Sequence, residues 1–231
     1  MRKGIIVILT AMFLAGYVFG QTADDFDVTL NAGGTLTITK YKGAEKQVVI
    51  PETINGIKVT EIGKRAFFSS QLTSIIIPDS VTSIGREAFL NNRLTSVTIP
   101  NSVTSIDKLA FTFNQLTSVT IPDSVTAIED LTFAKNRLTT VTISNSITSI
   151  GNSAFYQNQL TNVTIPNSVT SIGAYAFSDN PLTSVILPGD FQFHRTSFPN
   201  NLFDFFVSRG RKAGIYTWTG SAWIDRVWTA E

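Results

Sequence analysis

The feature that most constrains this chain is a unit of 22 residues that recurs in phase along its centre. Residues 94–115, LTSVTIPNSVTSIDKLAFTFNQ, give the unit in full, and its leucine and its phenylalanine return at the same positions in each copy. A repeat of this length is typical of a solenoid, in which each unit buries its apolar face against the next. We therefore predict a core of stacked ladders, built from Leu72, Leu94, Leu116, Leu138, Leu160 and Leu182, and from Phe67, Phe89, Phe111, Phe133, Phe155 and Phe177.

The first half of each unit has the pattern of a short, half-buried strand. Leu94, Val97 and Ile99 alternate with Ser and Thr, residue types that suit a pleated surface. Pro100 ends the strand because proline has no N–H to donate, and a turn is expected at 101–102. The run 103–106 then returns along the other side, and Ala110–Phe111 is expected on a short helical or irregular turn that inserts the ring into the coil.

An asparagine stands two residues before each leucine. This column favours an amide ladder that satisfies backbone groups in a tight turn, with a row of ligands as the less favoured alternative. Its members are Asn92, Asn114, Asn136, Asn158 and Asn180.

Another column changes residue type within the repeat. Gly85, Gly151 and Gly173 are replaced by Asp107 and Glu129 in the two middle units. Because Asp and Glu rarely adopt positive φ, this position is not expected to need the left-handed conformation.

The motif LTSVTIPNSVTSI, the AF pair and the asparagine before the next leucine resemble the BspA-like leucine-rich repeat proteins, over residues 48 to about 198. The resemblance implies a β-rich, right-handed solenoid with short parallel strands. It also implies an extracellular, non-enzymatic binding module, because the family is known chiefly from bacterial cell-surface and secreted proteins, several of them adhesins. It supplies no binding residues, because partners vary within the family.

Four segments are expected. Residues 1–20 combine Arg2–Lys3 with an apolar run and read as a signal peptide, with a retained anchor as the alternative. Residues 21–47 are expected to form a β-hairpin cap around a turn at 31–34, and residues 48–190 the solenoid, with an extra turn at Asn55–Gly56. Residues 191–231 are expected to form an aromatic cap, with a short helix between Asn200–Asn201 and Gly210 and a Trp-rich hairpin. The protein is thus expected to be exported, to the cell surface or the medium, with the periplasm also possible.

Composition narrows the function classes. Loss of residues 1–20 would remove Arg2 and Lys3 from the 18 basic residues, leaving 16 against 17 acidic residues and a net charge of −1. That balance argues against a nucleic-acid partner. With one histidine, no cysteine and no paired carboxylates, the sequence predicts no enzyme, no metal site and no cofactor. No second apolar span follows the first, so no membrane span is expected after cleavage.

Two regions are candidates for ligand contact. On the repeated strand the residues between the buried positions should point outward, giving an uncharged stripe closed at its ends by Ile76 and Ile186. Its candidate residues are Ser96, Thr98, Ser118, Thr120, Thr140, Thr142 and Thr164, and the column includes Asn162. In the Trp-rich hairpin, Tyr216, Trp218, Trp223 and Trp228 could contact a sugar or a protein, or could complete the cap.

The function predicted from these features is recognition of an extracellular protein or polysaccharide. The alternative is a structural surface or assembly protein without a dedicated ligand. A more distant alternative is the ordering of water on the regular Ser-x-Thr array, as ice-binding surfaces do. The oligomeric state does not follow from the sequence.

Overall fold

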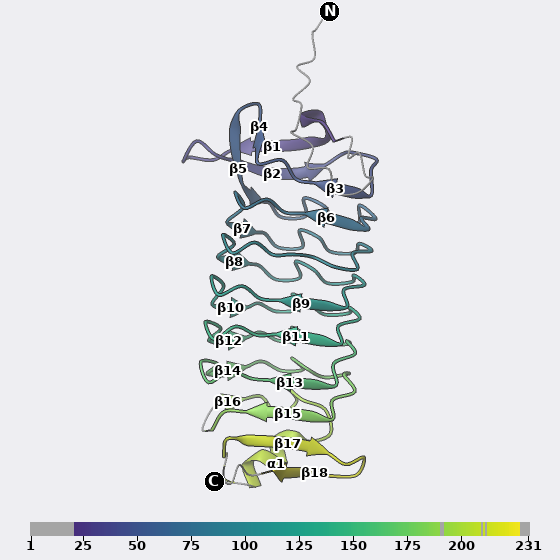
Figure 1. The fold of residues 1–231 in the computed structure, drawn as a ribbon, viewed down its shortest axis with the longest axis vertical. Helices are drawn as coiled ribbons and strands as arrows, with labels where there is room; N and C mark the ends of the chain where they lie inside the picture. The colour runs from purple at the N-terminus through teal and green to yellow at the C-terminus, as the bar shows by residue number, and fades with distance from the viewer. Residues whose placement is uncertain (1–20, 190–191, 209, 211, 227–231) are drawn as a thin grey trace, which may run out of the picture.

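A computed structural model describes residues 21–189, 192–208, 210 and 212–226. The chain forms a rod of stacked coils, with a β-hairpin at the N-terminal end and a helix with a second hairpin at the C-terminal end (Figure 1). The predicted β-solenoid is therefore confirmed. The predicted signal peptide, residues 1–20, lies outside the described residues.

The N-terminal hairpin extends the stack of strands beyond the first coil. Its strands pair antiparallel around the predicted turn, and the second strand pairs in parallel with a strand of the first coil. The extra turn at Asn55–Gly56 has φ values of 52° and 78°, the left-handed geometry that two-residue hairpins require. The elements of this region are η1 (Ala23–Asp25), β1 (Phe26–Leu30), β2 (Leu36–Tyr41), β3 (Gln47–Val49), β4 (Thr53–Ile54) and β5 (Ile57–Ile62).

The repeats place two columns of short strands on opposite sides of each coil (Figure 1). The strand face carries the first half of each unit: β6 (Ser74–Ile76), β9 (Ser118–Thr120), β11 (Thr140–Thr142), β13 (Asn162–Thr164) and β15 (Ser184–Leu187). The return face carries the second half: β7 (Ser83–Ile84), β8 (Ser105–Ile106), β10 (Ala127–Ile128), β12 (Ser149–Ile150), β14 (Ser171–Ile172) and β16 (Gln192–Phe193). Within each column the repeated strands that pair do so in parallel and in register.

The predicted phenylalanine ladder forms the spine of the core. The six rings are at most 1% exposed, and neighbouring centroids lie 5.2 to 5.7 Å apart with interplanar angles of 3° to 17°. Tyr41 extends the stack at the N-terminal end and Phe198 extends it at the C-terminal end, 5.4 and 5.0 Å from the adjacent rings. Burial of each ring contributes about 1.5 to 3 kcal/mol, so the spine is a main source of stability.

The asparagine column is a buried amide ladder, as predicted. Asn136 Nδ2 donates to the carbonyls of Phe111 and Phe133, at 3.0 and 3.1 Å, and its Oδ1 accepts from the backbone N–H of Leu116 at 3.1 Å. The other asparagines make the equivalent bonds. One amide therefore satisfies backbone groups of two successive coils.

Irregular turns carry the Ala–Phe pair, and their backbones form a ladder of their own. The N–H of each of Phe67, Phe89, Phe111, Phe133 and Phe155 donates to the carbonyl one residue before the next phenylalanine, at 2.8 to 2.9 Å. Two residues of each turn adopt positive φ without being glycine, for example Leu109 at 61° and Phe113 at 55°. Residues in this region of φ and ψ are costly, so neighbouring coils must hold them there.

The glycine column has ordinary φ values, as predicted, and is set by space instead. A Cβ on Gly151 would lie 2.6 Å from the N atom of Asp130 in the preceding coil, and one on Gly173 would lie 2.6 Å from the N atom of Asn152. A side chain at this position therefore crowds the preceding coil. The contact tolerates Asp107, whose N–H still donates to the Ile84 carbonyl at 2.9 Å.

The strand ladders are interrupted around the coil of residues 94–115. In the glycine column this coil has Asp107, and the coil that follows it has Glu129. Contrary to prediction, residues 96–98 are not a paired strand, and the return-face ladder stops at β8 and resumes at β10 (Figure 1). Glycine alone does not ensure pairing, because β11 and β13 are unpaired although Gly173 is retained.

The C-terminal segment covers the last coil. Strand β17 (Gly214–Trp218) pairs antiparallel with β15, and β18 (Trp223–Arg226) pairs with β17. Helix α1 (Leu202–Ser208) occupies the predicted interval. Asn200 and Asn201 precede it with φ of 59° and 57°, and the Asn201 carbonyl accepts a hydrogen bond from the Phe205 N–H at 3.3 Å. Trp228 lies outside the described residues.

Candidate functional site

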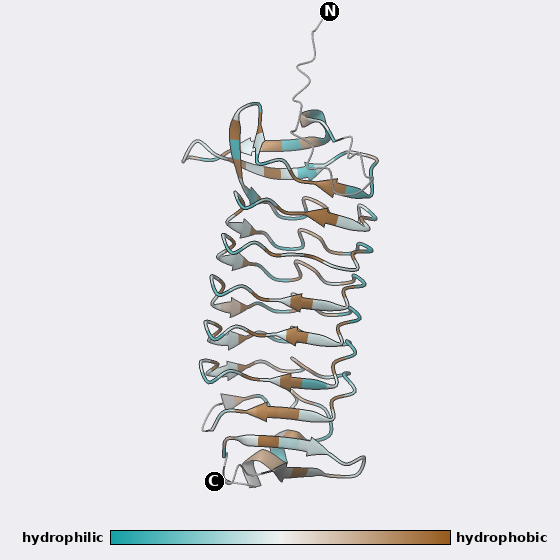
Figure 2. Ribbon diagram, viewed as in Figure 1, coloured by the Kyte–Doolittle hydropathy of each residue, from teal (hydrophilic) through white to brown (hydrophobic). Residues whose placement is uncertain are grey.

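The predicted stripe lies at the surface of the strand face. Along β9, β11 and β13 a central valine points inward and the residues on either side of it point outward. Figure 2 shows these strands as an apolar centre flanked by polar residues. All seven predicted stripe residues are exposed: Ser96, Thr98, Ser118, Thr120, Thr140, Thr142 and Thr164.

Parallel pairing aligns the central part of the stripe along the rod. Thr140 lies beside Ser118 and Thr142 beside Thr120, in register. Neighbouring strands lie about 4.8 Å apart, so the same hydroxyl group recurs at that interval on adjacent coils. Ile76, 42% exposed, and the half-buried Ile186 occupy the ends of the column, as the sequence predicts.

The stripe hydroxyls have no intramolecular partners. Within the part of the chain that the structure describes, none of the seven stripe hydroxyls forms a hydrogen bond to another protein group. Each therefore keeps one donor and its acceptor lone pairs for water or for a ligand.

Threonines of the return face behave differently. Thr82, Thr104, Thr148 and Thr170 are also exposed, but each donates its hydroxyl to a backbone carbonyl of the preceding coil at 3.1 to 3.2 Å. Their donors are already used within the fold.

The difference depends on position within the unit. On the strand face Thr139 and Thr183, which precede the strands, also donate to the preceding coil, at 3.3 and 3.2 Å. On the return face the exposed Ser105 and Ser171, which lie within the strands, form no side-chain hydrogen bond among the described residues.

The aromatic candidates lie mostly in the core. Tyr216 is fully buried and donates its hydroxyl to the carbonyl of Lys212, and Trp223 is 3% exposed and donates Nε1–H to the carbonyl of Asn200 at 3.0 Å. Trp218 is half-buried and lies 5.6 Å from Trp223 between ring centroids. In this conformation Trp218 alone of the three can present part of its ring to a ligand.

A shallow depression marks the return face where the ladder is interrupted. It is lined by residues of β7, β8 and β10, together with Asp107 and Glu129. Among the described residues, no group of three or more His, Asp or Glu side chains is placed to hold a metal ion.

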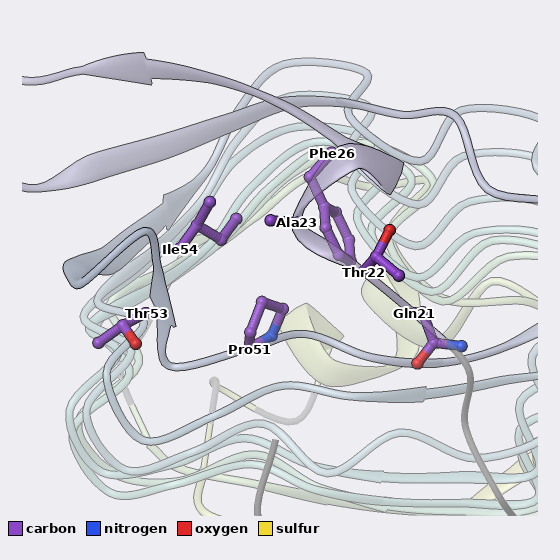
Figure 3. A pocket seen from close by; sticks show the side chains of 7 residues that line it. All are labelled: Gln21, Thr22, Ala23, Phe26, Pro51, Thr53 and Ile54. Carbon is purple, nitrogen blue, oxygen red and sulfur yellow. The ribbon is translucent and has the colours of Figure 1, made fainter. Parts of the chain in front are cut away.

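A small apolar cavity lies at the N-terminal end of the rod (Figure 3). Its volume is about 10 Å³, close to the lower limit for one water molecule. Side chains from the 3₁₀ turn and from the β4 region line it, among them Phe26, Pro51 and Ile54. A cavity of this size offers no room for an organic ligand.

The shifted titratable groups along the coils belong to surface contacts. Lys108 Nζ lies 2.9 Å from Asp130 Oδ2, and this hydrogen bond lowers the pKa of the Asp130 carboxyl. A hydrogen bond to Asp179, with smaller contributions from desolvation and charge, raises the pKa of Tyr156. His194 Nδ1 lies 2.8 Å from Thr196 Oγ1 and accepts a hydrogen bond from the Thr196 N–H at 3.3 Å. These groups link adjacent residues or coils and do not converge on a cavity.

One surface feature was missed by the sequence analysis. The column that precedes the leucines alternates Gln71, Arg93, Gln115, Arg137 and Gln159. The alternation is visible in the sequence, but the exposure and pairing of the arginines are not.

Comparison with known proteins agrees with the fold. Residues 82–204 match the family described as "BspA type Leucine rich repeat region", in six copies. A solved leucine rich cell surface protein from Faecalibacterium prausnitzii is 36% identical, with a TM-score of 0.59 over 74% of this chain and 54% of that one. The T. pallidum leucine rich repeat protein is 28% identical, with a TM-score of 0.44 over 73% of this chain and 71% of that one.

This chain spans about half the length of the Faecalibacterium protein. No curated protein matches the sequence. Among the residues described, no helix is long and apolar enough to cross a membrane.

Proposed function

Because this chain belongs to the BspA-type leucine-rich repeat family, we propose that it is an exported, non-catalytic binding module that recognises a protein or a polysaccharide through its strand face. The observation that carries the proposal is the row of exposed hydroxyls without intramolecular partners. A regular row of donors and acceptors can bind an extended ligand by several bonds at once, each contributing about 0.5 to 1.5 kcal/mol. The placement at the cell surface or outside the cell is supported by the similar protein from Faecalibacterium, described as a cell surface protein.

The test is binding of residues 21–231 to an array of glycans and extracellular matrix proteins. A stripe variant, Thr120→Val with Thr142→Val, should fold normally and weaken capture of any ligand that the wild type retains. The matched control is Thr104→Val with Thr148→Val on the return face, where the hydroxyls already bond to the backbone. Equal affinity of the stripe variant and the wild type would contradict the proposal.

The same preparation tests the alternative of an assembly protein. Its mass in solution should be that of a fixed small species if ligand binding is the main role. Open-ended assembly with no array ligand would instead support a structural function.

A further inference from the structure

Two exposed arginines and a half-buried lysine lie where the turns meet the strand face. We define the cationic turn patch as Arg93, Phe113, Lys135 and Arg137. The backbone connects its members across coils: Asn92 N–H donates to the carbonyl of Phe113 at 3.1 Å, and Lys135 Nζ lies 4.5 Å from the centre of the Phe113 ring. One aromatic side chain and three cations therefore share a short stretch of turn.

The arginines of this patch differ from the cations that form ion pairs in the described residues. Arg65 and Arg86 each contact Glu87 at 3.1 Å, Lys42 contacts Asp27, and Lys108 contacts Asp130. Arg93 and Arg137 are exposed, and within the described ranges they form no ion pair. The acidic residues that follow the strands, Asp79 and Asp123, come after the prolines at the other end of the strand. The guanidinium groups are thus available to an anion from outside.

Their spacing is set by the solenoid. Arg93 and Arg137 occupy the same column on coils separated by one intervening coil, which carries Gln115. At about 4.8 Å per coil, their backbone positions are about 10 Å apart along the rod. The stripe begins three residues further along each unit, at Ser96 and Thr140. Positive charges therefore alternate with a neutral residue beside the stripe hydroxyls.

Phe113 adds an apolar contact. Its side chain is 48% exposed and its φ is 55°, a conformation that is costly for an aromatic residue. An exposed ring beside cations suits a ligand that has both apolar faces and negative charges. A sugar acid has this combination, because the C–H face of the ring contacts aromatics while its carboxylate or sulfate contacts guanidinium.

We propose that the cationic turn patch anchors an acidic polysaccharide that runs along the rod beside the stripe, with a negative group on alternate sugars opposite Arg93 and Arg137. This inference rests on the proposed function and names the ligand class. An acidic polysaccharide fits the patch better than a nucleic acid does, because three cations on a chain close to neutrality cannot neutralise a densely charged phosphate backbone.

The experiment measures binding of residues 21–231 to hyaluronate, which carries a carboxylate on every second sugar, to neutral dextran, and to polyglutamate. We expect binding to hyaluronate that weakens with salt, and weak or no binding to the other two polymers. Arg93→Gln with Arg137→Gln should weaken hyaluronate binding roughly tenfold or more, since two charge-assisted contacts are lost. Glutamine is native at three positions of this column, so the double variant should fold.

The control, Lys64→Gln with Arg86→Gln, removes the same charge from another column and should change affinity less than about twofold. Equal loss in both double variants, unchanged binding in Arg93→Gln with Arg137→Gln, or preference for dextran or polyglutamate would overturn the proposal. If instead an array ligand is lost in the stripe variant while hyaluronate never binds, this inference fails and the proposed function stands.

Discussion

The strand face and the return face of the rod have almost the same composition but use it differently. Both expose a threonine on nearly every coil. On the return face the hydroxyl of Thr148 donates to the backbone of the preceding coil, whereas the hydroxyl of Thr142 on the strand face has no protein partner within the structure described. A threonine just before a strand, such as Thr148 or Thr139, is therefore part of the scaffold, whereas a threonine within the strand, such as Thr142, is available for recognition.

The difference follows from backbone geometry. On the return face the threonine immediately precedes the two-residue strand, and the carbonyl of its counterpart in the preceding coil lies within reach. On the strand face the outward residues belong to the strand itself, where the carbonyls of a pair are engaged by the ladder. Substitutions that destabilise both faces, and substitutions that affect only one of them, test this contrast between bonded and unbonded hydroxyls.

Phe133→Ala should destabilise both faces together, because the ring is 1% exposed at the middle of the shared spine. We expect a loss of about 3 to 5 kcal/mol in the free energy of unfolding, from lost burial and from the cavity left behind. Thermal or urea unfolding measures it. A melt that matches the wild type would contradict the stacked-ring core.

Asn136→Ala should cost less, but should again affect both faces. Removal of the amide leaves the carbonyls of Phe111 and Phe133 and the N–H of Leu116 without their side-chain partner. We expect a loss of roughly 2 to 3 kcal/mol by urea unfolding, from unsatisfied buried groups. Asn91→Ala, on the exposed neighbouring column, is the comparison, and an equal loss in the two variants would count against the ladder's role.

Thr148→Val and Thr142→Val separate the faces directly. The first removes a hydroxyl that bonds to the Thr126 carbonyl at 3.1 Å and should cost about 0.5 to 1.5 kcal/mol. The second removes an unpartnered hydroxyl and should change stability by less than about 0.5 kcal/mol. Chemical denaturation of the two variants side by side checks this order, and a reversal of the order would refute the proposed distinction.

The interruption of the return-face ladder gives the smallest expected effect, a difference in hydrogen exchange that is measured on the wild-type protein. Thr148 and Gly151 donate their N–H groups to the preceding coil at 2.8 and 2.7 Å, whereas in the described part of the chain the N–H groups of Thr126 and Glu129 make no such ladder bond. We expect faster hydrogen exchange at Thr126 and Glu129 than at Thr148 and Gly151, measured by NMR or mass spectrometry. Equal protection at both pairs would show that this contact between coils is as tight as the others.

The repeat made most of the fold predictable. Identical side chains at a fixed interval can be buried together only by stacking, so the positions of Phe133 and Asn136 followed from the alignment of the units. The local interruption did not follow, although Asp107 and Glu129 were visible departures, because the contact of a glycine with the preceding coil depends on three-dimensional distance.

The candidate site was predictable only in part. Outward orientation of Thr120 and Thr142 follows from strand alternation, but the freedom of their hydroxyls depends on where neighbouring carbonyls lie. Burial of Tyr216 and Trp223 could not be inferred either, because an aromatic hairpin has the same sequence whether its rings face the core or a ligand.

The ladder that joins the turns, in which each phenylalanine N–H meets the carbonyl one residue before the next phenylalanine, has a consequence for how such a gene can change. Every coil presents the same donors below and the same acceptors above, so in-frame duplication or deletion of one unit would recreate matching surfaces without altering either terminus. Recombination between copies of the repeat could therefore lengthen or shorten the rod, while the residues that contact a ligand diverge independently.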